Sequence, residues 1–378
     1  MRGIISALVI PLFCLTFLVL GLVINLVQVM LFVFIPKTIF RNVNYYLVCV
    51  IHGYLLSVGD WWANNEVNIY CSKDLQRRIM KKEVKEHAIF LMNHHTELDW
   101  LYSWMLGERM GVLGNCKAFA KSVLKFVPII GWSWAMSDMV FLSRGDWDKD
   151  QKTIKEKLTI LADYTSPVWL LLFPEGTRFT KQKHQASTEF AVKAKLPVME
   201  HHLTPRTKGF SFIMEVVDRK KFEAIYDITL VEGDDSAPFN ISSLISGRSC
   251  IGNVYIRRVP LNTVPINKEG SAAWLHNFYM EKDDLKKTFL RTGNFRADCS
   301  FIQPSRHYTG LLLLMASNIL VLAPLLYALV TGGWMMKLMV VFLGGIAMIA
   351  MKIIGDTTKI EKSSKYGVNN NQNLVKRE

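Results

Sequence analysis

Cysteine is scarce and scattered in this chain of 378 residues. The cysteines are Cys14, Cys49, Cys71, Cys116, Cys250 and Cys299. No two of them form a Cys-x-x-Cys pair, which excludes the usual zinc and dithiol motifs, and their spacing is not that of a disulfide scaffold. Unpaired thiols indicate a globular domain on the reducing, cytosolic side of a membrane.

Two further signatures are missing. The chain has no Gly-x-Ser-x-Gly elbow, so no serine is marked as the carrier of an acyl-enzyme intermediate. The net charge of +13 suits an anionic partner, either a nucleic acid, an anionic lipid or a phosphorylated substrate. Because no helix-turn-helix, zinc-finger or ribonucleoprotein signature is present, nucleic acid is the weakest of these options.

Charge is absent from a long run near the N-terminus, residues 4–36. A helix crosses a bilayer with ~20 apolar residues, so this run is longer than one span and short for two. It predicts one tilted helix or a tight re-entrant pair, and it is too long for a cleaved signal peptide. Residues 308–330 and 334–354 form a second apolar block, broken only by Thr331, Gly332 and Gly333, which predicts a transmembrane helical hairpin.

The charges that flank these blocks predict the topology. Lys37 and Arg41 follow the first block, and Arg306 precedes the hairpin. Positive residues collect on the cytosolic side, so residues 37–307 and the tail are expected there. We therefore predict an N-terminal membrane anchor over residues 1–43, a catalytic domain over 44–307, a transmembrane hairpin over 308–355, and a polar, disordered tail over 356–378.

The middle of the chain alternates between strand-like and helix-like segments. Strands are predicted at 88–92, 168–173, 226–231 and 253–259, and helices at 99–109, 148–164 and 187–195. This alternation favours an α/β fold with a mostly parallel sheet covered by helices on both faces.

The most informative motif is Asn-His-His-Thr-Glu-Leu-Asp, residues 93–99, between an apolar strand and a helix. A loop at such a turn can bring His94 and Asp99 together, and the carboxylate would then orient the imidazole and stabilise its protonated form. His94 would act as a general base on a substrate hydroxyl. Alternatives remain: a buried core histidine, Asp99 as a helix cap, or His95 as the base.

A second motif, Phe-Pro-Glu-Gly-Thr-Arg, follows the strand at 168–173. Gly176 and Arg178 can present backbone N–H groups and a guanidinium to a phosphate, Thr177 adds a hydroxyl, and Glu175 would orient the arginine or the backbone. An ordinary polar turn is the simpler alternative.

Three single residues are weaker candidates. Arg144 closes the apolar, strand-like stretch Val140–Arg144, Lys121 precedes Pro128 and Gly131, and Pro205 ends a predicted strand that begins at Leu196. The two cations could contact an anion, and Pro205 could shape a pocket wall. Each could equally be a solvated strand end or turn.

Taken together, these motifs resemble those of the 1-acyl-glycerol-3-phosphate acyltransferases and related lysophospholipid acyltransferases, over roughly residues 85–300. The flanking sequence is similar to the multi-spanning eukaryotic branch, which includes lysophosphatidate and lysocardiolipin acyltransferases. Two positions depart from the pattern: Asp138 stands where a glycine is common, and Thr204 precedes the proline of the fourth motif.

The resemblance implies that His94 is the general base and Asp99 its charge partner. It also implies a binding site for the phosphate of the acceptor made of Glu175, Gly176, Thr177 and Arg178, with Lys121, Arg144 and Pro205 contributing. Acyl-CoA is the implied co-substrate, without a cofactor or metal, and the implied location is the endoplasmic reticulum membrane.

The expected function is therefore acyl transfer from acyl-CoA to the free hydroxyl of a lysophospholipid, most simply 1-acyl-glycerol-3-phosphate. Other possibilities are a sister enzyme for lysocardiolipin, lysophosphatidylinositol or another lysolipid, an acyl-CoA hydrolase, and a membrane protein that only binds lipid.

Overall fold

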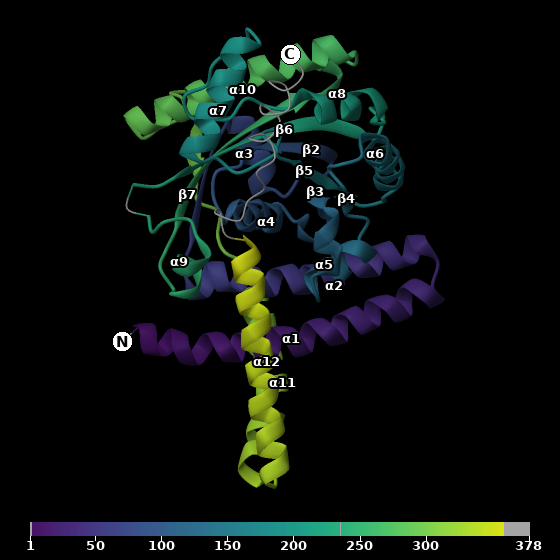
Figure 1. The fold of residues 1–378 in the computed structure, drawn as a ribbon, viewed down its shortest axis with the longest axis vertical. Coiled ribbons are helices and arrows are strands. Elements are labelled where there is room, and N and C mark those ends of the chain that lie inside the picture. Colours follow the sequence, from purple (N-terminus) through teal and green to yellow (C-terminus); the bar gives the residue numbers. More distant parts are fainter. Residues whose placement is uncertain (1, 235, 359–378) are drawn as a thin grey trace, which may run out of the picture.

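The computed structural model describes residues 2–234 and 236–358, which form an α/β domain with apolar helices attached (Figure 1). The central sheet has strand order β4-β3-β5-β2-β6-β7-β1-β8. The strands are β1 (Glu66–Cys71), β2 (His87–Met92), β3 (Cys116–Lys121), β4 (Val140–Leu142), β5 (Trp169–Leu172), β6 (Phe222–Glu232), β7 (Ile251–Pro260) and β8 (Ser300–Ile302). Strands β4, β3, β5, β2 and β6 are parallel to one another, whereas β7 is antiparallel to β6 and β8 to β1. The predicted mostly parallel α/β fold is confirmed.

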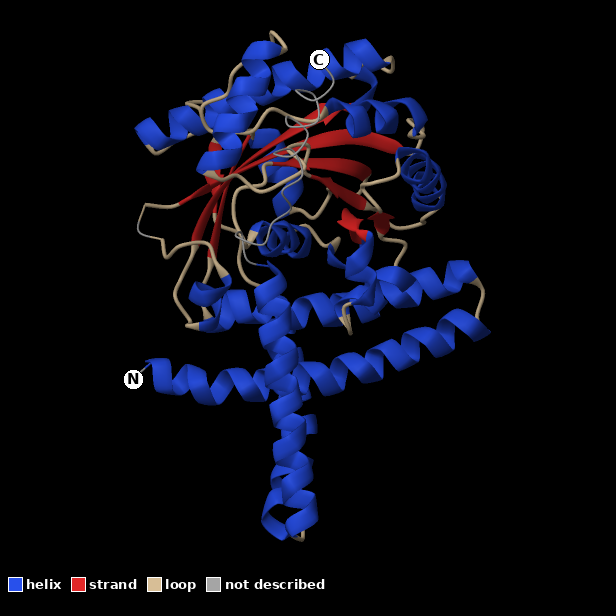
Figure 2. Ribbon diagram, viewed as in Figure 1, coloured by secondary structure: helices blue, strands red, loops and turns tan. Residues whose placement is uncertain are grey.

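Helices cover both faces of this sheet (Figure 2). The helices of the domain are α3 (Lys73–Met80), α4 (Asp99–Arg109), α5 (Ile130–Met136), α6 (Trp147–Ala162), α7 (Lys181–Lys193), α8 (Thr207–Val216), α9 (Ile241–Ile245) and α10 (Lys268–Thr292). Alternate residues of β2 serve opposite cores: Phe90 and Met92 pack with α3 and α4, whereas Ile89 and Leu91 pack with α6, α8 and α10. A strand that is buried on both faces reads as a continuous apolar run, as this one does.

Polar side chains lie at the starts of the helices that follow the loops of the sequence motifs. The Asp146 side chain accepts a hydrogen bond from Lys149 N at the start of α6, and Thr180 accepts one from Lys183 N at the start of α7. In α4 the carboxylate of Asp99 lies in the first turn, where the partial positive charge of the helix end favours it. These helix starts fix the loops that carry both motifs.

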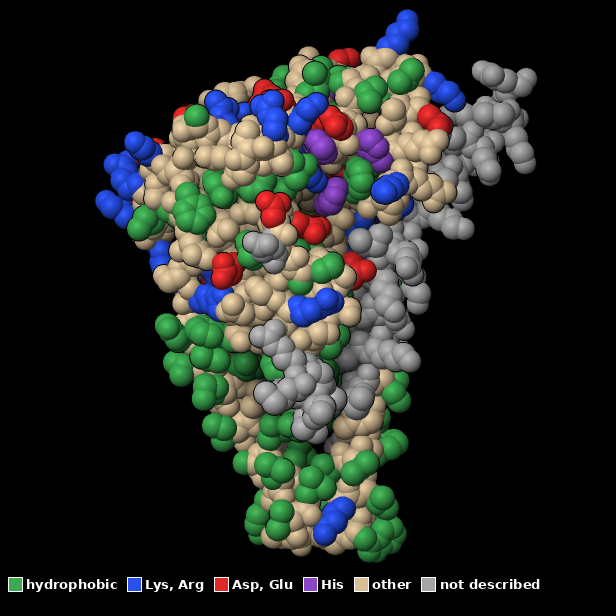
Figure 3. All heavy atoms as spheres, turned by 90° about the vertical axis from the view of Figure 1, so that its left-hand side faces the viewer, with side chains coloured by type: hydrophobic (Ala, Val, Ile, Leu, Met, Phe, Trp, Pro, Cys, Tyr) green, Lys and Arg blue, Asp and Glu red, His purple; other side chains and the backbone are tan. Residues whose placement is uncertain are grey.

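Four apolar or partly apolar helices complete the chain. Helix α1 (Arg2–Phe34) is a single continuous helix, so the N-terminal apolar run forms one helix and not a re-entrant pair. Helix α2 (Lys37–Ser57) follows it. Helices α11 (Tyr308–Thr331) and α12 (Trp334–Thr358) form a hairpin that projects from the domain, and α1 and α2 lie crosswise to it (Figure 1). By length and composition, Val9–Phe34 and Tyr308–Thr331 could each cross a membrane, which suggests a membrane protein. Figure 3 shows hydrophobic side chains gathered over the hairpin end and charged ones over the domain.

The sequence located the central strands and helix α4, but some boundaries and elements differ. The segment from Leu196 to Pro205 was predicted as a strand and is irregular, because its backbone donors are used by side chains of neighbouring elements instead of a sheet ladder. The predicted boundary between residues 43 and 44 falls within α2. Of the predicted tail, residues 356–358 belong to α12, and 359–378 lie outside the described residues.

Candidate active site

The predicted motifs meet at one edge of the sheet. The loops after β2, β4 and β5 carry His94, Arg144 and the segment 173–178, and Lys121 is the last residue of β3; all four strands are parallel. Because the carboxyl ends of parallel strands lie at the same edge, residues far apart in sequence come together there. His94, Lys121, Arg144, Phe173 and residues 176–178 line a cavity of about 1180 Å³, which runs from this edge of the sheet to helix α1.

His94 and Asp99 form a hydrogen-bonded pair at this edge. His94 Nδ1 lies 2.8 Å from Asp99 Oδ2, and Asp99 also accepts hydrogen bonds from the backbone N–H groups of His95 and Thr96 and from the Thr96 hydroxyl. Asp99 is 1% exposed, and His94 stacks on Phe173 with its side chain 22% exposed. Burial lowers the pKa of His94, and the Asp99 carboxylate opposes this. A lowered pKa favours the neutral imidazole, which is the form that can accept a proton.

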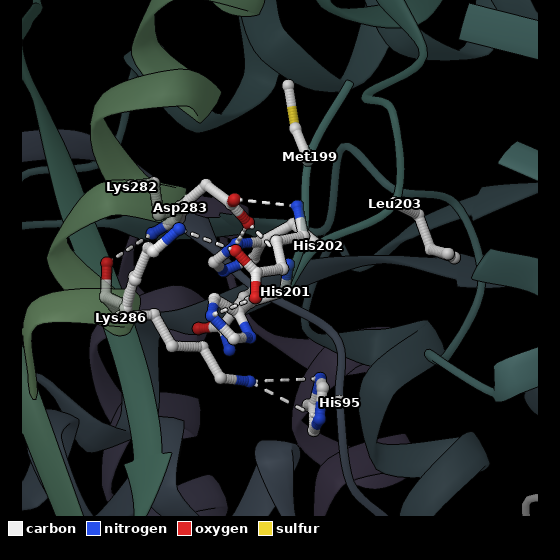
Figure 4. A network of polar contacts seen from close by, with 12 residues as sticks. His95, Met199, His201, His202, Leu203, Lys282, Asp283 and Lys286 are labelled. Carbon is white, nitrogen blue, oxygen red and sulfur yellow. Dashed lines mark hydrogen bonds and ion pairs between the residues drawn. The ribbon is translucent and has the colours of Figure 1, made fainter. Parts of the chain in front are cut away.

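The neighbouring histidine is placed differently. The ring of His95 stacks on Phe179, and both of its nitrogens lie 3.4 Å from Lys286 Nζ (Figure 4). Burial, followed by the positive charge of Lys286, lowers the pKa of His95 to about 3. Of the two histidines, His94 lines the cavity and His95 does not.

Glu175 accepts hydrogen bonds from backbone N–H groups and does not line the cavity. Its Oε1 accepts the N–H of His94 at 3.0 Å, and its Oε2 accepts the N–H of Leu203 at 3.3 Å. The residue is 2% exposed, and burial raises its pKa to about 8. Glu175 therefore joins the two motif loops to the segment that carries Pro205, and Pro205 likewise lies outside the cavity lining.

Cations gather at the polar end of the cavity. Lys121, Arg144 and Arg178 line it, and burial followed by the charges of Arg144 and Arg178 lowers the pKa of Lys121. Lys183 adds a fourth cation that the motif analysis missed: its Nζ donates to Thr177 Oγ1 at 2.8 Å. Its position in the first turn of α7, directly after the motif, is the signal that could have revealed it. Concentrated positive charge beside a neutral base suits a phosphate-bearing substrate.

Backbone strain accompanies two of these loops. Gly176 has φ of +71°, and a Cβ there would approach the Arg206 side chain to 3.0 Å, so the motif needs glycine. Arg144 has φ of +61°, and Asp150 holds this turn by accepting the N–H groups of Ser143 and Arg144. Strained backbone conformations that are held in place by contacts with neighbouring residues are typical of functional sites.

Asp138, the departure from the motif pattern, also has a positive φ, of +57°. This conformation explains why glycine is common at the position. The aspartate instead pairs with Lys157 at 2.8 Å, with Arg41 at 3.5 Å and with the Tyr164 hydroxyl at 3.1 Å. It thereby ties α2 and α6 to the start of β4.

The far end of the cavity is apolar. Phe13, Cys14 and Phe17 of α1 line it, together with Trp104 of α4 and Trp134 of α5. A buried polar cluster holds α1 in place: Gln28 donates to Asn44 at 2.6 Å and to Ser133 at 3.0 Å. The N-terminal helix is therefore a wall of the site as well as an apolar segment. Among the described residues, no group of three or more His, Cys, Asp or Glu could hold a metal ion.

A histidine–aspartate pair beside a cationic rim and an apolar cavity suits an acyltransferase, and sequence comparison agrees. Residues 66–230 match the acyltransferase family, and residues 243–316 match the acyltransferase C-terminus family. The chain belongs to the acyltransferase family.

Among its relatives are 1-acyl-sn-glycerol-3-phosphate acyltransferases of two types. The delta enzyme of Bos taurus is 36% identical over 94% of this chain and 93% of its own length. The gamma enzymes of Pongo abelii and Homo sapiens are each 36% identical, over 97% and 96% of this chain and 96% and 95% of their own. Similarity therefore extends over the apolar helices at both ends as well as the domain.

Proposed function

We propose that this protein transfers an acyl group from acyl-CoA to the free hydroxyl of 1-acyl-glycerol-3-phosphate, giving phosphatidate. One observation supports this most directly: the His94–Asp99 pair and the cations Lys121, Arg144 and Arg178 line the same cavity. The names of the relatives support the same acceptor.

In the proposed reaction, His94 Nε2 takes the proton of the acceptor hydroxyl, because Nδ1 is engaged by Asp99. The hydroxyl oxygen then attacks the thioester carbonyl carbon of acyl-CoA, and the carbonyl π electrons move to oxygen. When the tetrahedral intermediate collapses, the carbon–sulfur bond breaks and the imidazolium returns its proton to the CoA thiolate. Asp99 stabilises the imidazolium between these steps. No metal or cofactor takes part in this proposal.

The cation cluster favours a phosphomonoester acceptor. A phosphomonoester carries about −1.5 to −2 charge at pH 7, whereas a phosphodiester carries a single negative charge. Lys121, Arg144, Arg178 and Lys183 together offer more positive charge than one phosphodiester would need. Binding the phosphate here would hold the adjacent glycerol hydroxyl within reach of His94. Part of the binding energy would then serve to orient this hydroxyl for attack on the thioester.

We further propose a multi-pass protein of the endoplasmic reticulum membrane with the catalytic domain on the cytosolic side. Helices α11 and α12 would cross the bilayer as a hairpin, so that both ends of the pair lie on one side. Because α1 lies crosswise to the hairpin (Figure 2), α1 would run along the membrane, with its cavity-facing side towards the substrate. The acyl chains could then enter from the lipid while CoA approaches from water.

The test is acyl transfer by the purified protein in vesicles, with labelled acyl-CoA and a panel of lysophosphatidate, lysophosphatidylinositol, lysophosphatidylcholine and monolysocardiolipin. His94→Ala is the inactive variant, and His276→Ala, a histidine of α10 outside the cavity, is its matched control. We expect lysophosphatidate to be acylated best and only His94→Ala to be inactive. Preference for another lysolipid would replace the acceptor, fatty acid release without acceptor would indicate a hydrolase, and an active His94→Ala would refute the catalytic assignment.

A further inference from the structure

The segment between β3 and α5 turns large apolar side chains outward. Val123 is 62% exposed and Phe126 is 69% exposed, and Trp132 in the first turn of α5 is exposed as well. Exposed apolar residues that gather in one short segment usually mark a surface that contacts another molecule or a membrane. These three side chains therefore point to a contact outside the folded domain.

The same segment has a second face, which lines the cavity. Leu124, Val127 and Ile130 are lining residues, and along the chain they alternate with the exposed side chains. Lys121, which directly precedes the segment at the end of β3, is one of the cations at the polar end of the cavity. One short piece of chain, residues 122–132, thus forms a wall with the cavity on one side and an exposed apolar surface on the other.

A strained turn holds this segment in place. Ile129 has φ of +66° and ψ of −71°, and the N–H of Ile130 donates to the carbonyl of Pro128 at 2.8 Å, which is the geometry of a γ-turn. A β-branched residue rarely adopts a positive φ, so neighbouring contacts must hold it there. The Ile129 side chain packs against α1 at Gly21, where an added Cβ would lie 2.4 Å from Ile129 Cγ2. The segment is therefore docked on α1 at a defined point.

This contact joins the segment to a surface that suits a membrane. Leu22 and Val23, which follow Gly21 in α1, are exposed, and the stretch Val9–Phe34 is long and apolar enough to cross a bilayer. Helix α5 lies beside α1 and α2 at the base of the domain, on the side from which the hairpin projects (Figure 1). The exposed side chains of the segment therefore continue the apolar surface of α1.

A lysine beside the exposed phenylalanine suits the boundary between acyl chains and headgroups. Lys125 Nζ lies 4.9 Å from the centre of the Phe126 ring, and the Lys125 side chain is exposed. A lysine can extend its ammonium group to phosphates at a membrane surface while an adjacent ring lies among the acyl chains. An apolar protein partner would instead remove the ammonium group from water, which is costly. The pairing therefore favours a phospholipid surface.

We propose that segment 122–132 inserts into the membrane surface on the side of α1 and forms the entrance by which a membrane-bound lysolipid reaches the cavity. Val123, Phe126 and Trp132 would lie among the acyl chains, with Lys125 at the headgroups. The tail of the lysolipid would pass along the cavity-lining face of the segment while its phosphate reaches Lys121. The entrance rests on the proposed function, whereas the membrane contact does not.

Photo-crosslinking of the full-length protein in vesicles of phosphatidylcholine and phosphatidylserine tests the membrane contact. The photoreactive residue p-benzoylphenylalanine replaces Phe126 in one sample and Phe190 in the other. Phe190 is the matched control, because it is also exposed, at 48%, but lies on α7, at the end of the domain away from α1 (Figure 1). We expect lipid adducts, detected by mass spectrometry, at position 126 and not at position 190. The absence of lipid adducts at position 126, or adducts to a second copy of the chain in their place, would refute the proposal.

Steady-state kinetics in the same vesicles test the entrance. Moving a phenylalanine side chain from water into an apolar phase is worth about tenfold or more in a binding constant. Phe126→Ser should therefore raise the KM for long-chain lysophosphatidate by about tenfold, and Phe190→Ser should leave it unchanged. A short-chain lysophosphatidate supplied from water does not need the membrane route, so its KM should stay at the wild-type value in Phe126→Ser. An unchanged KM for the long-chain acceptor, or equal losses with both acceptors, would contradict the entrance.

The two measurements separate this inference from the proposed function. Lipid adducts at position 126 in a protein that acylates no lysolipid would refute the proposed function and support the membrane contact. An active acyltransferase without these adducts would refute the membrane contact and leave the proposed function standing.

Discussion

The sharpest prediction concerns Asp99→Asn, which removes the charge beside His94 and leaves the shape of the side chain. Asp99 Oδ2 accepts hydrogen bonds from His94 Nδ1 and His95 N, and Oδ1 accepts one from the Thr96 hydroxyl. An asparagine can keep its oxygen towards the histidines and donate its N–H to the Thr96 hydroxyl, which can also accept. The backbone N–H of Thr96, which lies 3.1 Å from both carboxylate oxygens, would keep Oδ2 as its acceptor, so the stability cost should stay below about 1 kcal/mol.

The loss in catalysis should be larger. A neighbouring opposite charge shifts a pKa by about one to three units, and each unit is worth about 1.4 kcal/mol. Without the carboxylate the imidazolium formed in the reaction loses about 1.4–4 kcal/mol of stabilisation, which corresponds to about tenfold to a thousandfold in kcat. Release of CoA thiol, followed continuously with a thiol reagent, measures this rate.

The control for Asp99→Asn is Asp146→Asn, the same chemical change at the residue that caps α6 and does not line the cavity, where asparagine caps as well as aspartate. Asp146→Asn should keep the wild-type rate. The reasoning fails if Asp99→Asn unfolds at the wild-type temperature and turns over within about threefold of the wild-type rate, because the charge would then contribute less than about 1 kcal/mol.

Three further predictions concern the rim, the strained turn and the cavity. Lys183→Met should raise the KM for lysophosphatidate by about tenfold, the loss of a charge-assisted contact, while Lys181→Met, an exposed lysine in the same turn, should leave it unchanged in the same steady-state assay. Asp138→Gly should relieve the strain of the positive φ but lose the ion pair with Lys157, so thermal unfolding should show a net loss of about 1 kcal/mol in the free energy of unfolding. A more stable variant would show that the ion pair contributes less than the strain costs. Phe13→Trp should fill part of the apolar end of the cavity, so competition between acyl-CoA species should shift towards shorter chains, and an unchanged profile would place the acyl chain elsewhere.

The sequence was sufficient to predict an element where a local residue pattern also serves the site. Helix α4 begins and ends at the predicted residues, because the aspartate that starts it is also the partner of His94. The strand before His94 is buried on both faces and appears as a plain apolar run. The mostly parallel sheet then follows from the alternation of such strands with helices.

The sequence was insufficient to predict the contacts of a residue whose partners lie far away along the chain. Glu175 was expected to orient Arg178 or the backbone, and the resemblance also placed it in the phosphate site; its two backbone partners lie 81 and 28 positions away and could not be named from the sequence. Strand β3 was missed because Cys-Lys-Ala-Phe-Ala-Lys lacks an apolar run, and only Lys117 and Ala120 of the strand are fully buried. Lys286 was not singled out from the sequence, since nothing local to α10 shows that this face of the helix is buried.

The position of the cavity connects the membrane helices with the chemistry. Its polar end holds His94 and the cations Lys121, Arg144 and Arg178, and its other end is lined by α1, which lies crosswise to the hairpin. An acceptor with a charged head and an insoluble tail can satisfy both ends only when its glycerol lies between them, next to the imidazole. Because Gln28 and Asn44 tie α1 to α2 by a buried hydrogen bond, the membrane segment also sets the depth of this cavity. The N-terminal helix should therefore be required for turnover as well as for membrane attachment, and replacing Gln28 by leucine should lower kcat while the protein stays in the membrane fraction.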